Sequence, residues 1–92
     1  MSKYESVAVF SVKEGEEKAK ALVEKFKALI EANGTMEAVD EWGVRKLAYE
    51  INYEPDGYYV LYTFEADVSF PAELERVYNI TDGVLRSIIV AR

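Results

Sequence analysis

Residues 58 to 66 read YYVLYTFEA, the most β-prone run of the 92-residue chain. Just before them, residues 55 to 57 (Pro-Asp-Gly) offer the proline, Asx and glycine chemistry of a tight turn. Residues 35 to 53, on the other side of that turn, are also extended in character, so the two segments predict a β-hairpin. Its first strand is interrupted at Trp42 and Gly43, where a glycine within a strand pattern indicates a bulge or a bend.

Two helices and two further strands are predicted outside this hairpin. Residues 14 to 32 place apolar side chains three and four positions apart, which is typical of an amphipathic helix. A shorter apolar stripe at 71 to 79 begins at Pro71, which a first helical turn tolerates. Residues 4 to 10 (YESVAVF) and 84 to 92 (VLRSIIVAR) are short and β-prone, as strands are.

The order of these elements, β-α-β-β-α-β, predicts an α+β fold. Because βαβ crossovers are right-handed, both helices fall on one face of a four-stranded antiparallel sheet, which is the ferredoxin-like sandwich. We expect one domain spanning residues 1 to 92, since a chain of this length buries roughly two-thirds of its unfolded surface. The N-terminus has no signal-peptide core and no apolar run approaches the ~18 residues of a membrane span, so we expect a cytoplasmic protein.

The sheet face away from the helices, called the open face below, is unexpectedly apolar. Side chains alternate between the two faces of a strand, so if Tyr4, Tyr58 and Tyr62 face the helices, their neighbours face outward. Arg86 and Arg92 lie beside the resulting patch, which is typical of a partner-binding surface. The alternatives are strand parities shifted by one residue, or long charged side chains lying across the patch. The open-face patch comprises Val7, Val9, Tyr59, Leu61, Ile88 and Val90.

The chain is acidic but unevenly so. Its formal net charge is −6, from 11 Lys and Arg against 17 Asp and Glu, which repels a phosphate backbone and argues against free-standing nucleic-acid binding. Residues 35 to 56 hold six acids beside Arg45 and Lys46, whereas residues 84 to 92 hold two arginines and no acid. Local contacts to phosphate therefore remain possible, because they depend on the charge at the interface.

The residues of most catalytic sites are missing. The chain has no cysteine and no histidine, so it lacks a thiolate nucleophile, a zinc-thiolate site and the commonest general base. The five glycines stand singly and form no phosphate-binding loop, and no serine has a recognised base. We therefore expect no enzyme, no cofactor, no metal, no small-molecule substrate and no membrane partner.

One segment resembles a known family signature. Residues 42 to 49 read WGVRKLAY, followed by Ile51 and then by GYY at 57 to 59, and this resembles the bacterial small-ribosomal-subunit protein six family. Three further matches keep the family's order and spacing: YE at 4 to 5, FPAELER at 70 to 76 and VLR at 84 to 86. The resemblance covers nearly the whole chain. It implies a ferredoxin-like, non-catalytic ribosomal protein that binds the central domain of small-subunit ribosomal RNA as a partner of ribosomal protein eighteen.

The resemblance also implies which residues make these contacts. The family's basic residues map onto Arg45, with Lys46 beside it, and onto Arg86, and we expect these to contact RNA. Arginine suits this role because its fork donates paired hydrogen bonds to phosphate oxygens. Lys3 and Arg92 are weaker candidates, because terminal charges are more often simply solvated. For Arg45 the alternative is a surface salt bridge to a neighbouring strand. The open-face patch is the candidate surface for the protein partner.

The sequence also allows other interpretations of Trp42 and of the protein class. Trp42 could stack on a base, but a cap over the end of the core is favoured. The RNA-recognition-motif fold has the same element order, although Asp56 stands where its aromatic motif wants a basic residue. A third class is a self-associating ferredoxin-like domain for ligand sensing or oligomerisation, whose open face pairs with a second copy.

Overall fold

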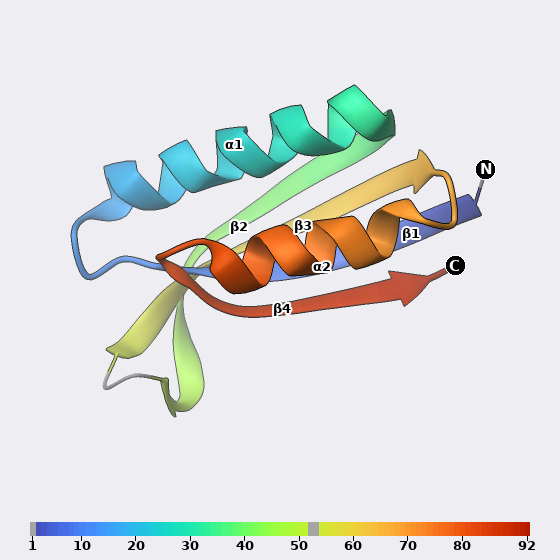
Figure 1. Cartoon of the computed structure of the whole chain (residues 1–92). Coiled ribbons are helices and arrows are strands. Elements are labelled where there is room, and N and C mark those ends of the chain that lie inside the picture. The colour runs from blue at the N-terminus through green and yellow to red at the C-terminus, as the bar shows by residue number, and fades with distance from the viewer. Residues whose placement is uncertain (1, 52–53) are drawn as a thin grey trace.

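The computed structural model describes residues 2–51 and 54–92 and has the predicted element order. The sheet order is β2-β3-β1-β4, and every neighbouring pair is antiparallel. Both helices lie on one side of this sheet (Figure 1), so the predicted architecture is confirmed. The elements are β1 (Ser2–Ser11), α1 (Glu16–Asn33), β2 (Gly34–Ile51), β3 (Glu54–Ala66), α2 (Phe70–Ile80) and β4 (Val84–Ala91).

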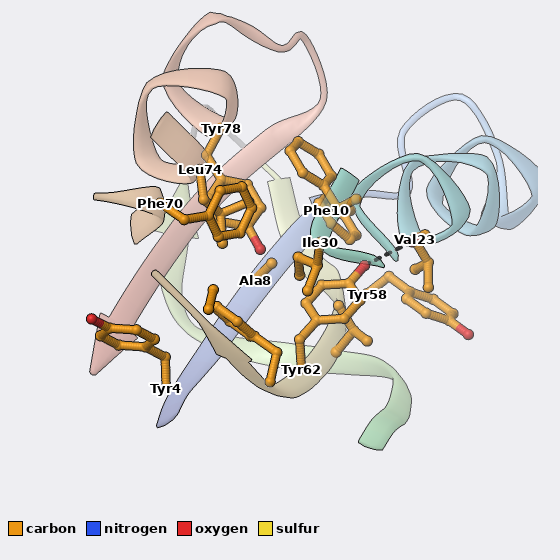
Figure 2. Close-up of a cluster of buried hydrophobic side chains, with 14 of the residues drawn as sticks. Tyr4, Ala8, Phe10, Val23, Ile30, Tyr58, Tyr62, Phe70, Leu74 and Tyr78 are labelled. Carbon is orange, nitrogen blue, oxygen red and sulfur yellow. Dashed lines mark hydrogen bonds between the residues drawn. The ribbon is translucent and has the colours of Figure 1, made fainter. Parts of the chain in front are cut away.

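The core lies between the helices and the sheet and is rich in aromatic side chains (Figure 2). Phe26 of α1 is central: its ring centroid lies 4.4 Å from that of Tyr78 and 5.7 Å from that of Phe10. Burying a side chain of this size contributes about 1.5–3 kcal/mol. The strand residues predicted to face the helices all belong to this core, namely Tyr4, Ala8, Phe10, Tyr58, Val60, Tyr62 and Phe64.

Buried hydroxyl groups in this core are satisfied by hydrogen bonds. The hydroxyls of Ser6 and Tyr78 lie 2.8 Å apart, and the hydroxyl of Tyr62 donates to the backbone carbonyl of Val23 at 2.8 Å (Figure 2). Burial raises the pKa of Tyr78 to about 12 and also raises the pKa of Tyr62. Both phenols therefore stay protonated at neutral pH, and Tyr62 keeps the proton that it donates to the carbonyl of Val23.

The hairpin of β2 and β3 is longer than predicted, and the turn predicted at 55 to 57 is wrong. Asp56 pairs with Lys46 and Gly57 with Arg45, so this segment is part of β3. Gly57 is a glycine for reasons of space: the Cγ1 atom of Val9 lies where its side chain would begin. Residues 52 and 53, predicted as the end of the first hairpin strand, lie outside the described residues.

The predicted bulge in β2 is confirmed. Glu41 pairs with Val60 and Gly43 with Tyr59, so Trp42 is an extra residue with no partner in the ladder. Gly43 has φ +81°, a conformation that glycine adopts without strain. A second register shift lies between residues 36 and 38. Beyond the bulges the hairpin extends past the helices and bends away from them (Figure 1).

Helix α1 ends at Asn33, one residue beyond the predicted range, and Gly34 follows it without a left-handed conformation. Its φ of −174° is extended, so β2 begins there directly. A Cβ atom at Gly34 would lie 2.9 Å from the Cβ atom of Ala66 and would also meet the backbone carbonyl of Glu65. The glycine is therefore required by the close approach of β3.

We expect Gly34→Ala to lower the free energy of unfolding by about 1–3 kcal/mol, because the methyl group must push against the β3 backbone. Urea unfolding followed by circular dichroism measures the loss. Thr35→Ala, at an exposed neighbouring position, is the control and should stay within about 0.5 kcal/mol of the parent. Equal stability of the two variants would contradict the steric explanation.

We also expect stability to fall as the pH rises from about 10, where tyrosine titrates in an unfolded chain, to about 12. The folded state keeps the Tyr78 proton in that window and the unfolded state releases it, so the contribution is complete below the unfolded pKa and is lost above it. In Tyr78→Phe the decline should be shallower by up to about 1.4 kcal/mol per pH unit. Urea unfolding between pH 9 and 11.5 tests this, and identical slopes would refute it.

Candidate functional site

The sheet register brings the open-face patch together as predicted. Val7 of β1 lies opposite Leu61 of β3 on one side and opposite Ile88 of β4 on the other. Val9 likewise lies between Tyr59 and Arg86, and Val90 pairs with Glu5 one step along. Because directly opposite residues share a face, these side chains lie on the side away from the helices. The predicted strand parities are therefore confirmed.

The patch is exposed except at Val9. Ile88 and Val90 on β4 are 44% and 54% exposed, and Val7, Tyr59 and Leu61 are half-buried. The prediction that Val9 belongs to the exposed set is wrong, since only 3% of it is accessible.

The part of the β2–β3 hairpin beyond the bulge explains the burial of Val9. Gly57 has no side chain, and the Cδ2 atom of Leu47 lies 3.5 Å from the position that its Cβ would take. Val9 reaches the same position from β1. Leu47 is itself only 8% exposed. The sequence could not reveal this contact, because it depends on how the hairpin bends.

Trp42 lies on the open face, so the predicted cap over the core is wrong. Its ring stacks on Tyr59, with centroids 6.2 Å apart and planes at 17°, and it is 40% exposed. The indole Nε1 donates a hydrogen bond to the Oδ2 atom of Asp40 at 3.1 Å. Ordinary alternation accounts for this side: Val39 and Glu41 lie opposite Tyr62 and Val60 of the core, so the next side chain, Trp42, points to the open face. Counting that alternation along β2 was the signal that could have found it.

Three of the predicted RNA-binding residues lie toward the same end of the sheet. Arg45 and Lys46 are exposed on the distal part of β2, and Arg86 is exposed near the start of β4. The Nε atom of Arg45 donates to the backbone carbonyl of Trp42 at 3.3 Å. Among the side chains that the structure describes, none of these three cations forms an ion pair.

Lys3 and Arg92 lie toward the opposite end. The backbone N–H of Arg92 donates to the carbonyl of Lys3 at 2.9 Å. Arg92 forms an ion pair with Glu5 at 2.9 Å, and Lys3 forms one with Glu37 at 3.5 Å. Lys3 and Val9 are six positions apart on β1, about 20 Å of strand, so the five predicted cations do not form one surface.

A groove of about 650 Å³ lies on the other side of the molecule, between the segment that follows β1 and the one that precedes β4. Its charges are mixed: Lys18 and Glu14 form an ion pair at 2.6 Å, and Lys25 donates to Thr81 at 3.5 Å. Within residues 2–51 and 54–92, no group of three or more acidic, histidine or cysteine side chains is placed to hold a metal ion. Neither described helix is long and apolar enough to cross a membrane.

Comparisons with known proteins agree with one another. The family model described as ribosomal protein S6 matches residues 3–91. Small ribosomal subunit protein bS6 of Clostridium perfringens is 54% identical over 91 residues, which covers 98% of this chain and 96% of the relative. The protein of the same name from Clostridium botulinum strain 657 is 50% identical over 93 residues, covering 100% and 99%. The crystal structure of 30S ribosomal protein S6 from Thermotoga maritima superposes with a TM-score of 0.92 at 33% identity, covering 99% of this chain and 87% of that one.

These matches extend over almost every element of the fold, and the structural likeness confirms the ferredoxin-like prediction. They also confirm the resemblance carried by WGVRKLAY. Proteins of this kind are structural components of the cytoplasmic ribosome of bacteria and not enzymes, as predicted for this chain. The chain therefore belongs to the ribosomal protein S6 family and is a protein of the small ribosomal subunit.

Proposed function

We propose that this protein, as one domain of residues 1 to 92, binds the central domain of small-subunit ribosomal RNA together with ribosomal protein eighteen. One observation carries the proposal: a sheet with one face filled by the core presents an exposed apolar patch on the other. Membership of the ribosomal protein S6 family supports it, because a protein of the small subunit works surrounded by RNA and other proteins.

The protein contact is assigned to the open-face patch. Ile88 and Val90 are large apolar side chains that are about half exposed, and Val7 and Leu61 continue the patch across the sheet. Contiguous apolar surface of this kind is typical of interaction sites, and covering it contributes about 25 cal/mol per Å². A protein partner supplies the complementary apolar surface.

The RNA contact is assigned to Arg45, Lys46 and Arg86. They are exposed and, within the described side chains, not engaged with acids, so contact with phosphate costs no existing ion pair. Lys3 and Arg92 rank lower, because binding RNA would compete with their pairs to Glu37 and Glu5.

The net charge explains why the two contacts belong together. At −6 the protein repels a polyanion at long range, so its few cations give weak RNA binding alone. A partner on the open face that also contacts RNA adds its own binding energy to theirs and raises the effective concentration of each contact. The proposed mode is therefore assembly of protein pair and RNA as one complex.

We expect Arg45→Ala and Arg86→Ala each to weaken binding to a central-domain ribosomal RNA fragment about tenfold in the presence of ribosomal protein eighteen. The reason is the loss of charged hydrogen bonds to phosphate, which should also lower the slope of log K against log salt by about 1 per variant. Filter binding at several salt concentrations measures both quantities.

The matched control is Arg76→Ala. Arg76 is an exposed arginine on α2, already paired with Glu73 at 2.6 Å, and its removal should leave RNA affinity unchanged. Lys3→Ala and Arg92→Ala should each lower the RNA affinity less than threefold. A larger loss at Lys3 and Arg92 than at Arg45 and Arg86 would reverse the ranking drawn from the ion pairs.

We further expect Ile88→Asp to weaken the complex with ribosomal protein eighteen at least tenfold, because it places a charge in the middle of the apolar contact. Isothermal titration calorimetry measures the affinity. Val68→Asp is the control: Val68 is 72% exposed but lies in the segment before α2, away from the sheet face. Equal losses for both substitutions, or no loss for Ile88→Asp, would remove the open face from the interface.

A further inference from the structure

Trp42 is an exposed side chain held in one place by several constraints. Trp42 follows Glu41, which lies opposite Val60 of the core, so its indole points to the open face, next to the left-handed Gly43 of the bulge. Its ring stacks on Tyr59, and its N–H donates to Asp40 at 3.1 Å. On the other side, Arg45 donates to the carbonyl of Trp42 at 3.3 Å. The result is an oriented aromatic surface with 40% of the tryptophan accessible.

The acids of β2 differ in how they are neutralised. Glu37 is paired with Lys3, and Glu41 accepts a hydrogen bond at 2.7 Å from Tyr58, whose pKa this bond raises to about 12. Asp40 receives only the neutral indole N–H and forms no ion pair among the described side chains. An exposed carboxylate with uncompensated charge thus lies at the edge of the aromatic pair.

We propose that Trp42, Tyr59 and Asp40 form a receptor for one cationic side chain, arginine or lysine, of the protein that covers the open face. The aromatic face attracts a cation through its quadrupole. A guanidinium group can lie flat on the indole while its N–H groups donate to the second oxygen of Asp40. The inference rests on the proposed function for the identity of the partner, but the chemistry of the receptor is independent of it.

The charges favour a protein cation over other occupants. A nucleotide stacked on the indole of Trp42 would bring its phosphate toward the carboxylate of Asp40, which repels it. A second copy of this chain carries the same net charge of −6 and is repelled at long range. A positively charged segment of another protein is attracted both by the carboxylate of Asp40 and by the net charge of the chain.

The first experiment measures calorimetric affinity for ribosomal protein eighteen. We expect Trp42→Leu and Asp40→Asn each to weaken binding about tenfold, and Trp42→Phe to cost less because it keeps an aromatic face. Asp40→Asn should also reduce the salt dependence. Glu31→Gln, an exposed acid near the end of α1, is the matched control and should bind like the parent. Unchanged affinity in Trp42→Leu, Trp42→Phe and Asp40→Asn would overturn the receptor but would not contradict the proposed function.

The second experiment needs no ribosomal partner, because Trp42 is the only tryptophan in the chain and its fluorescence reports on this site alone. We expect a hexa-arginine peptide to change the emission of the parent, and a matched peptide with neutral citrulline in place of arginine to leave it unchanged. In Asp40→Asn the response should weaken at least threefold. A response to arginine supports the receptor even if ribosomal protein eighteen fails to bind.

Three other results would overturn the receptor. Oligouridylate could change the emission where the arginine peptide does not, which would assign the ring to a base. Emission could change on dilution of the protein alone, which would assign the surface to a second copy. Finally, the tryptophan emission could change neither with the arginine peptide nor with ribosomal protein eighteen. Calorimetry reports separately whether ribosomal protein eighteen binds.

Discussion

The alternation of side chains along β3 is the constraint on which the rest of the structure depends. This strand pairs with β1 on one side and with β2 on the other, so each of its residues is fixed to one of two faces. Tyr58, Val60, Tyr62 and Phe64 therefore enter the core, and Tyr59 and Leu61 face outward. A slip of one residue would expose four core side chains at once. The alternation of this one strand therefore determines both the core and the open-face patch.

Prediction from sequence succeeded where a strand or helix keeps one period from end to end. The alternation in β1, β3 and β4 was enough to place the open-face patch, because the one register shift between β1 and β4 lies beyond it, between Val9 and Phe10. The spacing of three and four residues was enough for both helices. Prediction failed where the role of a residue depends on a contact with a residue far away in the chain. Gly57 suggested a turn, yet it is small because Val9 needs its space, and the same contact buries Val9. Trp42 was misplaced because a large aromatic side chain was expected to join the core, whereas the alternation of β2 puts it on the open face, where it stacks on Tyr59.

The distribution of charge shows why net charge alone describes this protein poorly. Toward one end of the sheet, Lys3 and Arg92 are engaged with Glu37 and Glu5, and the cations contribute little attraction beyond those pairs. Toward the other end, Arg86 is exposed at the start of β4 without such a pair among the described side chains. A chain with a net negative charge can therefore present exposed cations locally that are unpaired within its described part.

Two of the three register shifts in the β2–β3 ladder, at residues 36–38 and 41–43, have a consequence for the length of this strand. On both sides of each shift the ladder to β3 is regular, with Met36 opposite Phe64 and Ala38 opposite Thr63, then Glu41 opposite Val60 and Gly43 opposite Tyr59. Each shift is therefore a place where the chain can lose its additional residue without altering any flanking pair. A hairpin without these two residues would keep every flanking pair with β3, and each remaining side chain would stay on the face of the sheet that it occupies now.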